Sequence, residues 1–125
     1  MEPLRVVLVE DNDVFRDALA LLFELREDVE LVASLPDGSE AAGVCARLEP
    51  DVIVVDFRLP GLDGVEVAQA VRHAYPDVAV VCLSGGELGN HATAALRAAG
   101  VDEVVLKDEP FEVMLDAIKR AGGRG

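Results

Sequence analysis

Short runs of Val, Ile and Leu alternate along the chain with stretches whose apolar residues recur every three or four positions. The first pattern is typical of buried strands, and the second is typical of helices that cover one face of a sheet. The predicted strands lie at residues 4–9, 29–33, 52–55, 78–83 and 103–106. The predicted helices lie at residues 14–26, 36–48 and 64–74, from the Gly85-Gly86 break to about residue 99, and at 110–121. Five strands therefore alternate with five helices.

The predicted strands carry few polar residues, which indicates that helices cover both of their faces. Strands of this kind, separated by helices, form a parallel sheet, so the pattern predicts a doubly wound α/β fold. In such sheets, ligands bind beyond the carboxyl ends of the strands, near the point where the strand order reverses. Functional residues should therefore lie where the strands end.

Composition indicates the class of protein and the cellular compartment. A chain of 125 residues with 51% hydrophobic residues is expected to form one soluble domain, and no apolar run is long enough to cross a bilayer. The net charge of −13 would repel a phosphate backbone, so we expect no nucleic-acid binding by this chain and no membrane contact. Cys45 and Cys82 form no CxxC motif, and no secretory leader is apparent, which favours a reduced cytoplasmic protein. We assign residues 1–121 to the domain and 122–125 to a flexible tail or linker stub.

Charged and hydroxyl side chains stand where four of the predicted strands end. They are Glu10 and Asp11 after the first strand, Asp56 after the third, Ser84 after the fourth and Lys107 after the fifth. Two like charges about 4 Å apart repel by about 4 kcal/mol at an effective dielectric constant near 20, so three converging carboxylates call for a cation. Because every available ligand is an oxygen, the site favours Mg²⁺ over zinc.

These residues, in this order, resemble the receiver domain of bacterial two-component response regulators. The resemblance covers essentially the whole chain and rests on Glu10-Asp11, on the segment 56–64, on Ser84 and on Lys107. It implies a CheY-like (flavodoxin-like) fold with five parallel strands in the order 2-1-3-4-5. It also implies that a sensor histidine kinase is the phosphoryl donor. The receiver domain itself would catalyse only its own phosphorylation and dephosphorylation.

The resemblance further implies a role for each residue of the site. Asp56 accepts the phosphoryl group, and Asp11, Asp56 and the main-chain carbonyl of Arg58 bind Mg²⁺. Glu10 supports the metal through water, while the serine and lysine after the fourth and fifth strands hold phosphoryl oxygens. Elementary electrostatics agrees, because a carboxylate that attacks phosphorus must overcome repulsion from an anionic donor.

Two positions depart from the family pattern. Val104 stands where an aromatic residue is usual, so we expect the signal to pass through the Ser84 loop and the next helix, or through homodimerisation. Asp108, rather than proline, follows the lysine, as in receivers of NarL/LuxR-type transcription regulators. Those proteins carry a C-terminal DNA-binding domain that this chain lacks. The chain is therefore either a single-domain receiver or a receiver excised from a transcription regulator.

Three other functions fit part of the sequence. The triplet Asp11-Asn12-Asp13 imitates the motif of haloacid-dehalogenase phosphohydrolases, but Asp56 would then have no role and the chain has no room for a cap domain. A flavodoxin-like cofactor carrier would place a phosphate where Glu10 and Asp11 repel it. An interaction module with a receiver fold but no phosphorylation would leave the whole acidic, serine and lysine set without a purpose.

Local signals predict details around the site. Asp13 is the expected cap of the first helix, and Asp63 is the expected cap of the helix that begins at Gly64. Proline in Pro60-Gly61 sets a turn, and the glycines of this loop, Gly64 included, are expected to permit a positive φ. These residues are predicted to shape the loop that holds Asp56.

Overall fold

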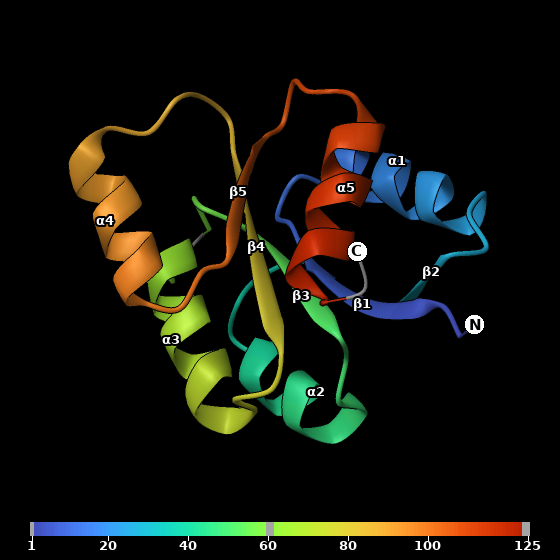
Figure 1. Cartoon of the computed structure of the whole chain (residues 1–125), viewed down its shortest axis with the longest axis horizontal. Coiled ribbons are helices and arrows are strands. Elements are labelled where there is room, and N and C mark those ends of the chain that lie inside the picture. Colours follow the sequence, from blue (N-terminus) through green and yellow to red (C-terminus); the bar gives the residue numbers. More distant parts are fainter. Residues whose placement is uncertain (1, 60–61, 124–125) are drawn as a thin grey trace.

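The computed structural model describes residues 2–59 and 62–123, which form one sheet between two layers of helices (Figure 1). The strands are β1 (Leu4–Val9), β2 (Val29–Leu35), β3 (Val52–Asp56), β4 (Ala79–Ser84) and β5 (Glu103–Leu106). The helices are α1 (Asp13–Glu24), α2 (Ala41–Leu48), α3 (Gly64–Ala74), α4 (Asn90–Ala98) and α5 (Phe111–Ala121). The sheet has the order β2-β1-β3-β4-β5, and all neighbouring strands are parallel. The doubly wound fold and its strand order are confirmed.

Each face of the sheet has its own helical layer and its own core (Figure 1). Helices α1 and α5 cover one face, and α2, α3 and α4 cover the other. The central strand β3 serves both cores, because Val52 and Val54 pack toward α1 and α5 while Ile53 and Val55 pack toward the opposite layer. Each such side chain contributes about 1.5–3 kcal/mol when it is fully buried. This double anchoring fixes where Asp56, the last residue of β3, emerges.

The strands that carry functional residues extend one residue further than the apolar pattern indicates. Strand β3 includes Asp56 and β4 includes Ser84, so both side chains belong to the sheet and not to the loops. The parallel ladders explain this difference, since Asp56 is paired with Leu83 and Ser84 is paired with Leu106. A polar side chain at a strand end does not interrupt main-chain pairing, which is why hydropathy alone ends these strands too early.

Two helices begin later than predicted. Helix α2 begins at Ala41, because the Asp37 carboxylate accepts hydrogen bonds from the amide and hydroxyl of Ser39 and so holds a turn before the helix. Such short-range side-chain bonds compete with helical hydrogen bonds. Helix α4 begins only at Asn90, which leaves a five-residue connection between β4 and α4 beside the predicted site.

The first helix has a different cap from the one predicted. Asn12 is the cap, because its side-chain oxygen accepts a hydrogen bond from the amide of Phe15 at 2.9 Å. The prediction that Asp13 is the cap is wrong, since the Asp13 carboxylate pairs with the Arg16 guanidinium at 2.6 Å. Arg16 also donates to the main-chain carbonyl of Glu10 at 2.7 Å, which ties the first turn of α1 to the end of β1.

The start of α3 confirms one expectation and corrects another. Asp63 caps the helix, accepting from the Glu66 amide at 2.9 Å, and the Glu66 carboxylate accepts from the Asp63 amide in return. Gly64 does not adopt a positive φ. A glycine is needed there because a Cβ would lie 2.9 Å from the Phe57 Cα and 3.1 Å from the Asp56 carbonyl oxygen. The predicted turn at residues 60–61 lies outside the described residues.

The two cysteines are buried and the two histidines lie on the surface. Cys45 and Cys82 are free and buried, and burial raises the pKa of the Cys45 thiol to about 11 and that of Cys82 to about 12. His73 and His91 are exposed on helices. None of the described helices has the length and apolar character needed to cross a membrane.

Candidate functional site

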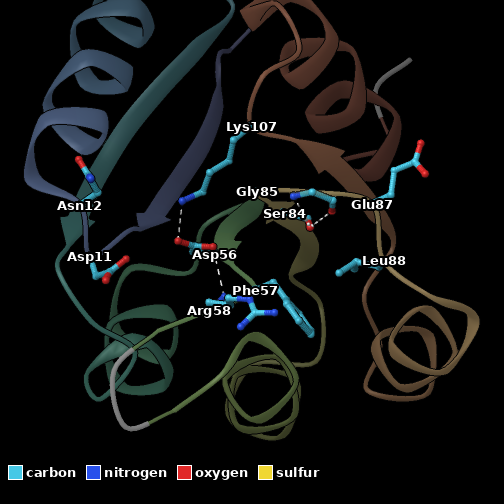
Figure 2. A pocket seen from close by; sticks show the side chains of 11 residues that line it. Asp11, Asn12, Asp56, Phe57, Arg58, Ser84, Gly85, Glu87, Leu88 and Lys107 are labelled. Atoms are coloured by element: carbon cyan, nitrogen blue, oxygen red, sulfur yellow. Dashed lines mark hydrogen bonds and ion pairs between the residues drawn. The ribbon is translucent and has the colours of Figure 1, made fainter.

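A cavity of about 410 Å³ opens at the carboxyl edge of the sheet. Its wall includes residues from the ends of β1, β3, β4 and β5, as the fold predicts for a parallel sheet. Figure 2 shows Asp11, Asp56 and Lys107 pointing toward one another across it. Of the predicted site residues, the wall includes Asp11, Asp56, Arg58, Ser84 and Lys107.

Asp56 lies at the centre of the cavity and is almost completely buried. One carboxylate oxygen accepts a hydrogen bond from the Lys107 ammonium at 2.7 Å, and the other accepts from the amide of Arg58 at 3.2 Å (Figure 2). These bonds orient the carboxylate, because the two donors come from separate segments of the chain. The family resemblance implies a role for the main-chain carbonyl of Arg58. In the structure, the main-chain amide of the same residue is in direct contact with Asp56.

The three carboxylates predicted to converge do so. Glu10, Asp11 and Asp56 each offer an oxygen such that all three atoms lie within 4.8 Å of one another. Glu10 is fully buried, and its Oε2 accepts from the Asn12 amide at 3.0 Å. Its Oε1 has no hydrogen-bond partner among the described residues, although the Lys107 ammonium lies 2.7 Å away as an ion pair. A buried carboxylate oxygen with spare capacity, in an all-oxygen cluster, fits a hard divalent cation.

Electrostatic effects at Glu10 and Lys107 act in opposite ways. Burial raises the pKa of Glu10, and the Asp56 charge adds to the rise, while Lys107 and the Asn12 amide offset part of it. Burial alone would lower the pKa of Lys107, but its close contacts with the Asp56 and Glu10 carboxylates outweigh that effect and raise the pKa above the ordinary value. The lysine therefore stays cationic and is shared by two carboxylates.

Ser84 lines the same cavity but faces its own loop. Its hydroxyl donates to the carbonyl of Gly86 (Figure 2) and accepts from the Gly86 amide at 3.4 Å. The hydroxyl must therefore exchange its bond to Gly86 before it can reach a group on Asp56. A Cβ added at Gly85 or Gly86 would meet nothing within 4 Å, so the loop leaves the approach to Asp56 open.

One residue of the site was missed by sequence reasoning. The Lys107 ammonium lies 5.1 Å from the ring centroid of Phe15, in the first turn of α1. Phe15 fits the helical apolar period of residues 14–26, which by itself indicates only a helix face that packs on the sheet. Its separation of 92 positions from the lysine hides the contact from any local pattern.

Comparison with known proteins decides the family. The family model described as response regulator receiver domain matches residues 6–119. The chain belongs to this family. The receiver domain is 33% identical over 123 residues to the nitrate/nitrite response regulator protein NarP of Escherichia coli K12, covering 98% of this chain and 56% of that protein.

Other relatives agree on the receiver and differ in the rest of the protein. The receiver is 35% identical to protein-glutamate methylesterase/protein-glutamine glutaminase 5 of Myxococcus xanthus, over 98% of this chain and 35% of that enzyme. It superimposes on the signal receiver domain of NarL from Mycobacterium tuberculosis with a TM-score of 0.84 and 29% identity, covering 95% of this chain and 98% of that one. The chain spans about half the length of many of the curated relatives it matches. The similarity to NarL/LuxR-type receivers is thereby confirmed, and the chain is a receiver domain of two-component response regulators.

Proposed function

We propose that Asp56 is the phosphoacceptor and that Lys107 and Ser84 assist the transfer. The observation that carries this assignment is the Lys107 ammonium at 2.7 Å from Asp56, within a cluster of three carboxylates at the mouth of a cavity. Buried charged groups held in this way are characteristic of reactive sites. Among the described residues, Glu10 and Asp56 are the buried carboxylates, and Asp56 is the one that also lines the cavity.

The proposed transfer moves a phosphoryl group to an oxygen of Asp56. A bond forms between that oxygen and phosphorus, and the bond from phosphorus to the donor's nitrogen or acyl oxygen breaks. A histidine donor leaves with the electron pair and takes up a proton as neutral imidazole. Lys107 compensates the charge on the phosphoryl oxygens, and the main-chain amide of Arg58 keeps the carboxylate aimed. Positioning and charge compensation are the main requirements of such a reaction.

Glu10, Asp11, Asp56 and the carbonyl of Arg58 are the groups that would hold Mg²⁺. When bound, the ion supplies positive charge that offsets repulsion between the carboxylates and an anionic donor. The buried Oε1 of Glu10, which has an ion-pair partner in Lys107 but no assigned hydrogen bond among the described residues, and the all-oxygen donor set support this assignment. Asp11 is the exposed member of the cluster, so its carboxylate is the one that solvent reaches directly.

Ser84 is the proposed link between phosphorylation and output. A phosphoryl group carries about two negative charges and strong acceptor oxygens, which compete with the Gly86 carbonyl for the Ser84 hydroxyl. A change of partner would draw the β4–α4 connection toward Asp56. Val104 on β5 is partly exposed and offers no aromatic rotamer for the signal, so this connection is the proposed route.

The partners follow from the family and remain part of the proposal. The donor is a sensor histidine kinase in the cytoplasm, and the output is transcription regulation through a DNA-binding domain beyond this chain. A similar receiver segment occurs in the methylesterase relative, which supports an output that is decided outside residues 1–121. Residues 122–125 are proposed as the start of the connection to that output. The receiver itself is proposed to bind no nucleic acid, because it carries a net charge of −13.

Intact-mass analysis after incubation with Mg²⁺ and acetyl phosphate tests the assignment. The wild-type receiver should gain one phosphoryl increment, and Asp56→Asn or an excess of chelator should abolish it. Asp77→Asn, which removes an exposed aspartate after α3, is the matched control and should label normally. Absence of label both from acetyl phosphate and from a panel of phosphorylated histidine kinases would contradict the proposal and favour an interaction module.

Mapping the label separates the receiver from a phosphohydrolase. The acyl phosphate is reduced with borohydride, and the peptides are sequenced by mass spectrometry. The receiver assignment expects the modified aspartate at Asp56, with Asp11→Asn reducing labelling through weaker metal binding. Modification at Asp11 in a protein that turns over acetyl phosphate continuously would instead support the phosphohydrolase.

A further inference from the structure

The ring of Phe15 makes a contact with the site that the proposed transfer does not use. Its centroid lies 5.1 Å from the Lys107 ammonium, within the distance at which the face of an aromatic ring attracts a cation. The lysine side chain is only 24% exposed, so water screens this attraction less than on an open surface. The ammonium therefore has three partners among the described residues: Glu10, Asp56 and the ring of Phe15.

These three partners differ in what happens to them during the reaction. Asp56 becomes the modified residue, and Glu10 belongs to the cluster that fits a divalent cation. In the loaded site Asp56 would lose its carboxylate charge and Glu10 would share its charge with the ion, so both would hold the lysine less tightly. The ring of Phe15 carries no charge and forms no bond to metal or phosphoryl group, so it is the partner that remains.

The local structure holds the ring in place. The amide of Phe15 donates to the Asn12 cap at 2.9 Å, which fixes the first turn of α1. Arg16, the next residue, donates to the main-chain carbonyl of Glu10 at 2.7 Å and joins this turn to the end of β1. The ring also packs against the core between the sheet, α1 and α5. Phe15 is thus anchored on both sides, while its ring faces the end of the long, intrinsically flexible Lys107 side chain.

We propose that Phe15 is a positioning residue for phosphoryl transfer, whose ring keeps the Lys107 ammonium aimed at the phosphoryl group after the carboxylates have released it. The inference rests on the proposed function of Asp56 and Lys107. It predicts that ring electronics at position 15 set the rate of the transfer step, and that the shape of the side chain matters less.

Nuclear magnetic resonance tests the contact without any turnover. A methylene group held over a ring face is shielded, so the Lys107 Hε signals should lie upfield in the wild-type protein and return toward ordinary values in Phe15→Leu. Addition of Mg²⁺ and beryllofluoride, a phosphoryl analogue, should leave the wild-type signals upfield. Loss of the shielding in the loaded protein would overturn the proposal, because the lysine would then have left the ring.

A graded series of rings tests the effect on the reaction. Mono-, di- and trifluorophenylalanine at position 15 weaken the attraction for a cation stepwise while nearly keeping the size of the ring. The maximal rate of labelling by acetyl phosphate should fall stepwise along the series, by about two- to fivefold at its end, and the half-saturating donor concentration should stay constant. Phe15→Tyr should retain the wild-type rate.

Phe23 provides the matched control. It lies on the same helix, is 1% exposed and stacks edge-to-face on Phe111 at 5.2 Å, away from the lysine. Fluorination at Phe23 should alter thermal stability and leave the labelling rate unchanged. Thermal melting shows whether each variant is folded. If Phe15→Leu does not fold, the fluorinated variants are used in its place.

The outcomes separate this inference from the proposed function. A wild-type protein that takes no label overturns the function of Asp56, and the Hε shielding then still reports on the contact alone. A wild-type protein that labels normally, with equal rates along the fluorinated series, overturns the role of Phe15 and leaves the function of Asp56 intact.

Discussion

Glu10 shows at the scale of one residue how the site is loaded with charge. Two carboxylates, Glu10 and Asp56, share one ammonium, and Asp11 adds a third negative charge within 4.8 Å of both. The raised pKa of Glu10, caused first by burial, expresses the unfavourable free energy of its ionised form. Without a metal, this electrostatic repulsion lowers the stability of the folded protein. A binding site differs in this way from a core that is optimised for stability alone.

Replacing Glu10 tests that interpretation. Glu10→Gln keeps the shape of the side chain and removes one buried negative charge, so we expect the metal-free protein to gain about 1 kcal/mol in its free energy of unfolding. Mg²⁺ affinity should fall at least about tenfold, as for the loss of a group that supports a metal. Urea unfolding in chelator and Mg²⁺ titration followed by amide chemical shifts measure the two effects. A variant that loses stability in chelator would show that Glu10 is a structural partner of Lys107.

Gly64 is a second residue whose role is steric. A Cβ at this position would approach the Phe57 Cα to 2.9 Å, which real side chains do not tolerate without a shift of the main chain. We expect Gly64→Ala to lower the free energy of unfolding by about 1–3 kcal/mol and to slow labelling of Asp56, whose carbonyl lies beside the same Cβ. Gly43→Ala, on the helix α2, meets nothing within 4 Å and serves as the control. Denaturant melts and labelling rates measured on both variants check the prediction.

At the scale of elements, the first turn of α1 contains both the helix cap and Phe15, whose ring lies beside Lys107. The sequence Asn12-Asp13 contains two residue types that cap helices equally well, so propensity alone cannot choose between them. The choice depends on Arg16, which pairs with Asp13 and leaves Asn12 to bond the Phe15 amide. A side chain in the same turn of the helix therefore decided which of the two residues is the cap.

Substitution of the cap tests this arrangement. Asn12→Ala should lower the free energy of unfolding by about 1 kcal/mol, because the Phe15 amide loses its side-chain acceptor. Asp13→Ala, at an exposed position, removes only a surface ion pair with Arg16, and its effect should stay below about 0.5 kcal/mol. Chemical denaturation of both variants makes the comparison. Equal losses would return Asp13 to the role of cap.

Much of the fold and the site was predictable because their signals are local and repeated. Five apolar runs alternate with five segments of helical period, which predicts a parallel sheet. Charged or hydroxyl residues follow four of the runs, and the parallel sheet brings them to one edge, so the sheet type also predicts the site. The exact ends of β3 and β4 were missed because main-chain pairing continues through Asp56 and Ser84. The bond of Ser84 to its own loop and the ring beside Lys107 depend on three-dimensional contacts that no spacing reveals.

At the scale of the whole molecule, a charged cluster joins the end of α1 to α5. Asp28, just before β2, pairs with Arg26 at 2.9 Å and with Lys119 of α5 at 2.5 Å. Hydrogen bonds from Arg26 and then Lys119 hold the pKa of Asp28 far below its usual range. The stabilisation is therefore complete above the unfolded-state pKa, near 3.9, and is lost as the pH falls below it.

The pH dependence of one variant checks this linkage. Asp28→Asn should be less stable than wild type by no more than about 1 kcal/mol at neutral pH, because the cluster is largely exposed and screened by solvent. The difference should narrow as the pH is lowered from about 5 to about 2, since Asp28 in the unfolded wild-type chain takes up a proton in this range while the folded carboxylate stays ionised. Urea unfolding at several pH values gives the difference directly. A gap that widens toward acid would contradict the sign of the linkage.

An exposed apolar row along α1 and its C-cap provides a surface for self-association. Val14, Leu21 and Leu25 are 81%, 64% and 80% exposed and lie seven and four positions apart, which places them on one face of the helix. We propose that a second copy covers this row once Asp56 is phosphorylated. The charge of −13 on each copy opposes association, so the dimer should strengthen as salt screens that repulsion.

Sedimentation equilibrium with Mg²⁺ and beryllofluoride measures this association. The wild-type mass should rise toward that of a dimer, more so in about 0.5 M salt than in 0.05 M, where the screening length is several-fold longer. Leu21→Glu should keep the protein monomeric, whereas Val104→Thr, at an exposed apolar position on β5, should dimerise like wild type. Loss of dimer only in Val104→Thr would move the interface to β5, and an unchanged wild-type mass with the analogue bound would show that the receiver signals as a monomer.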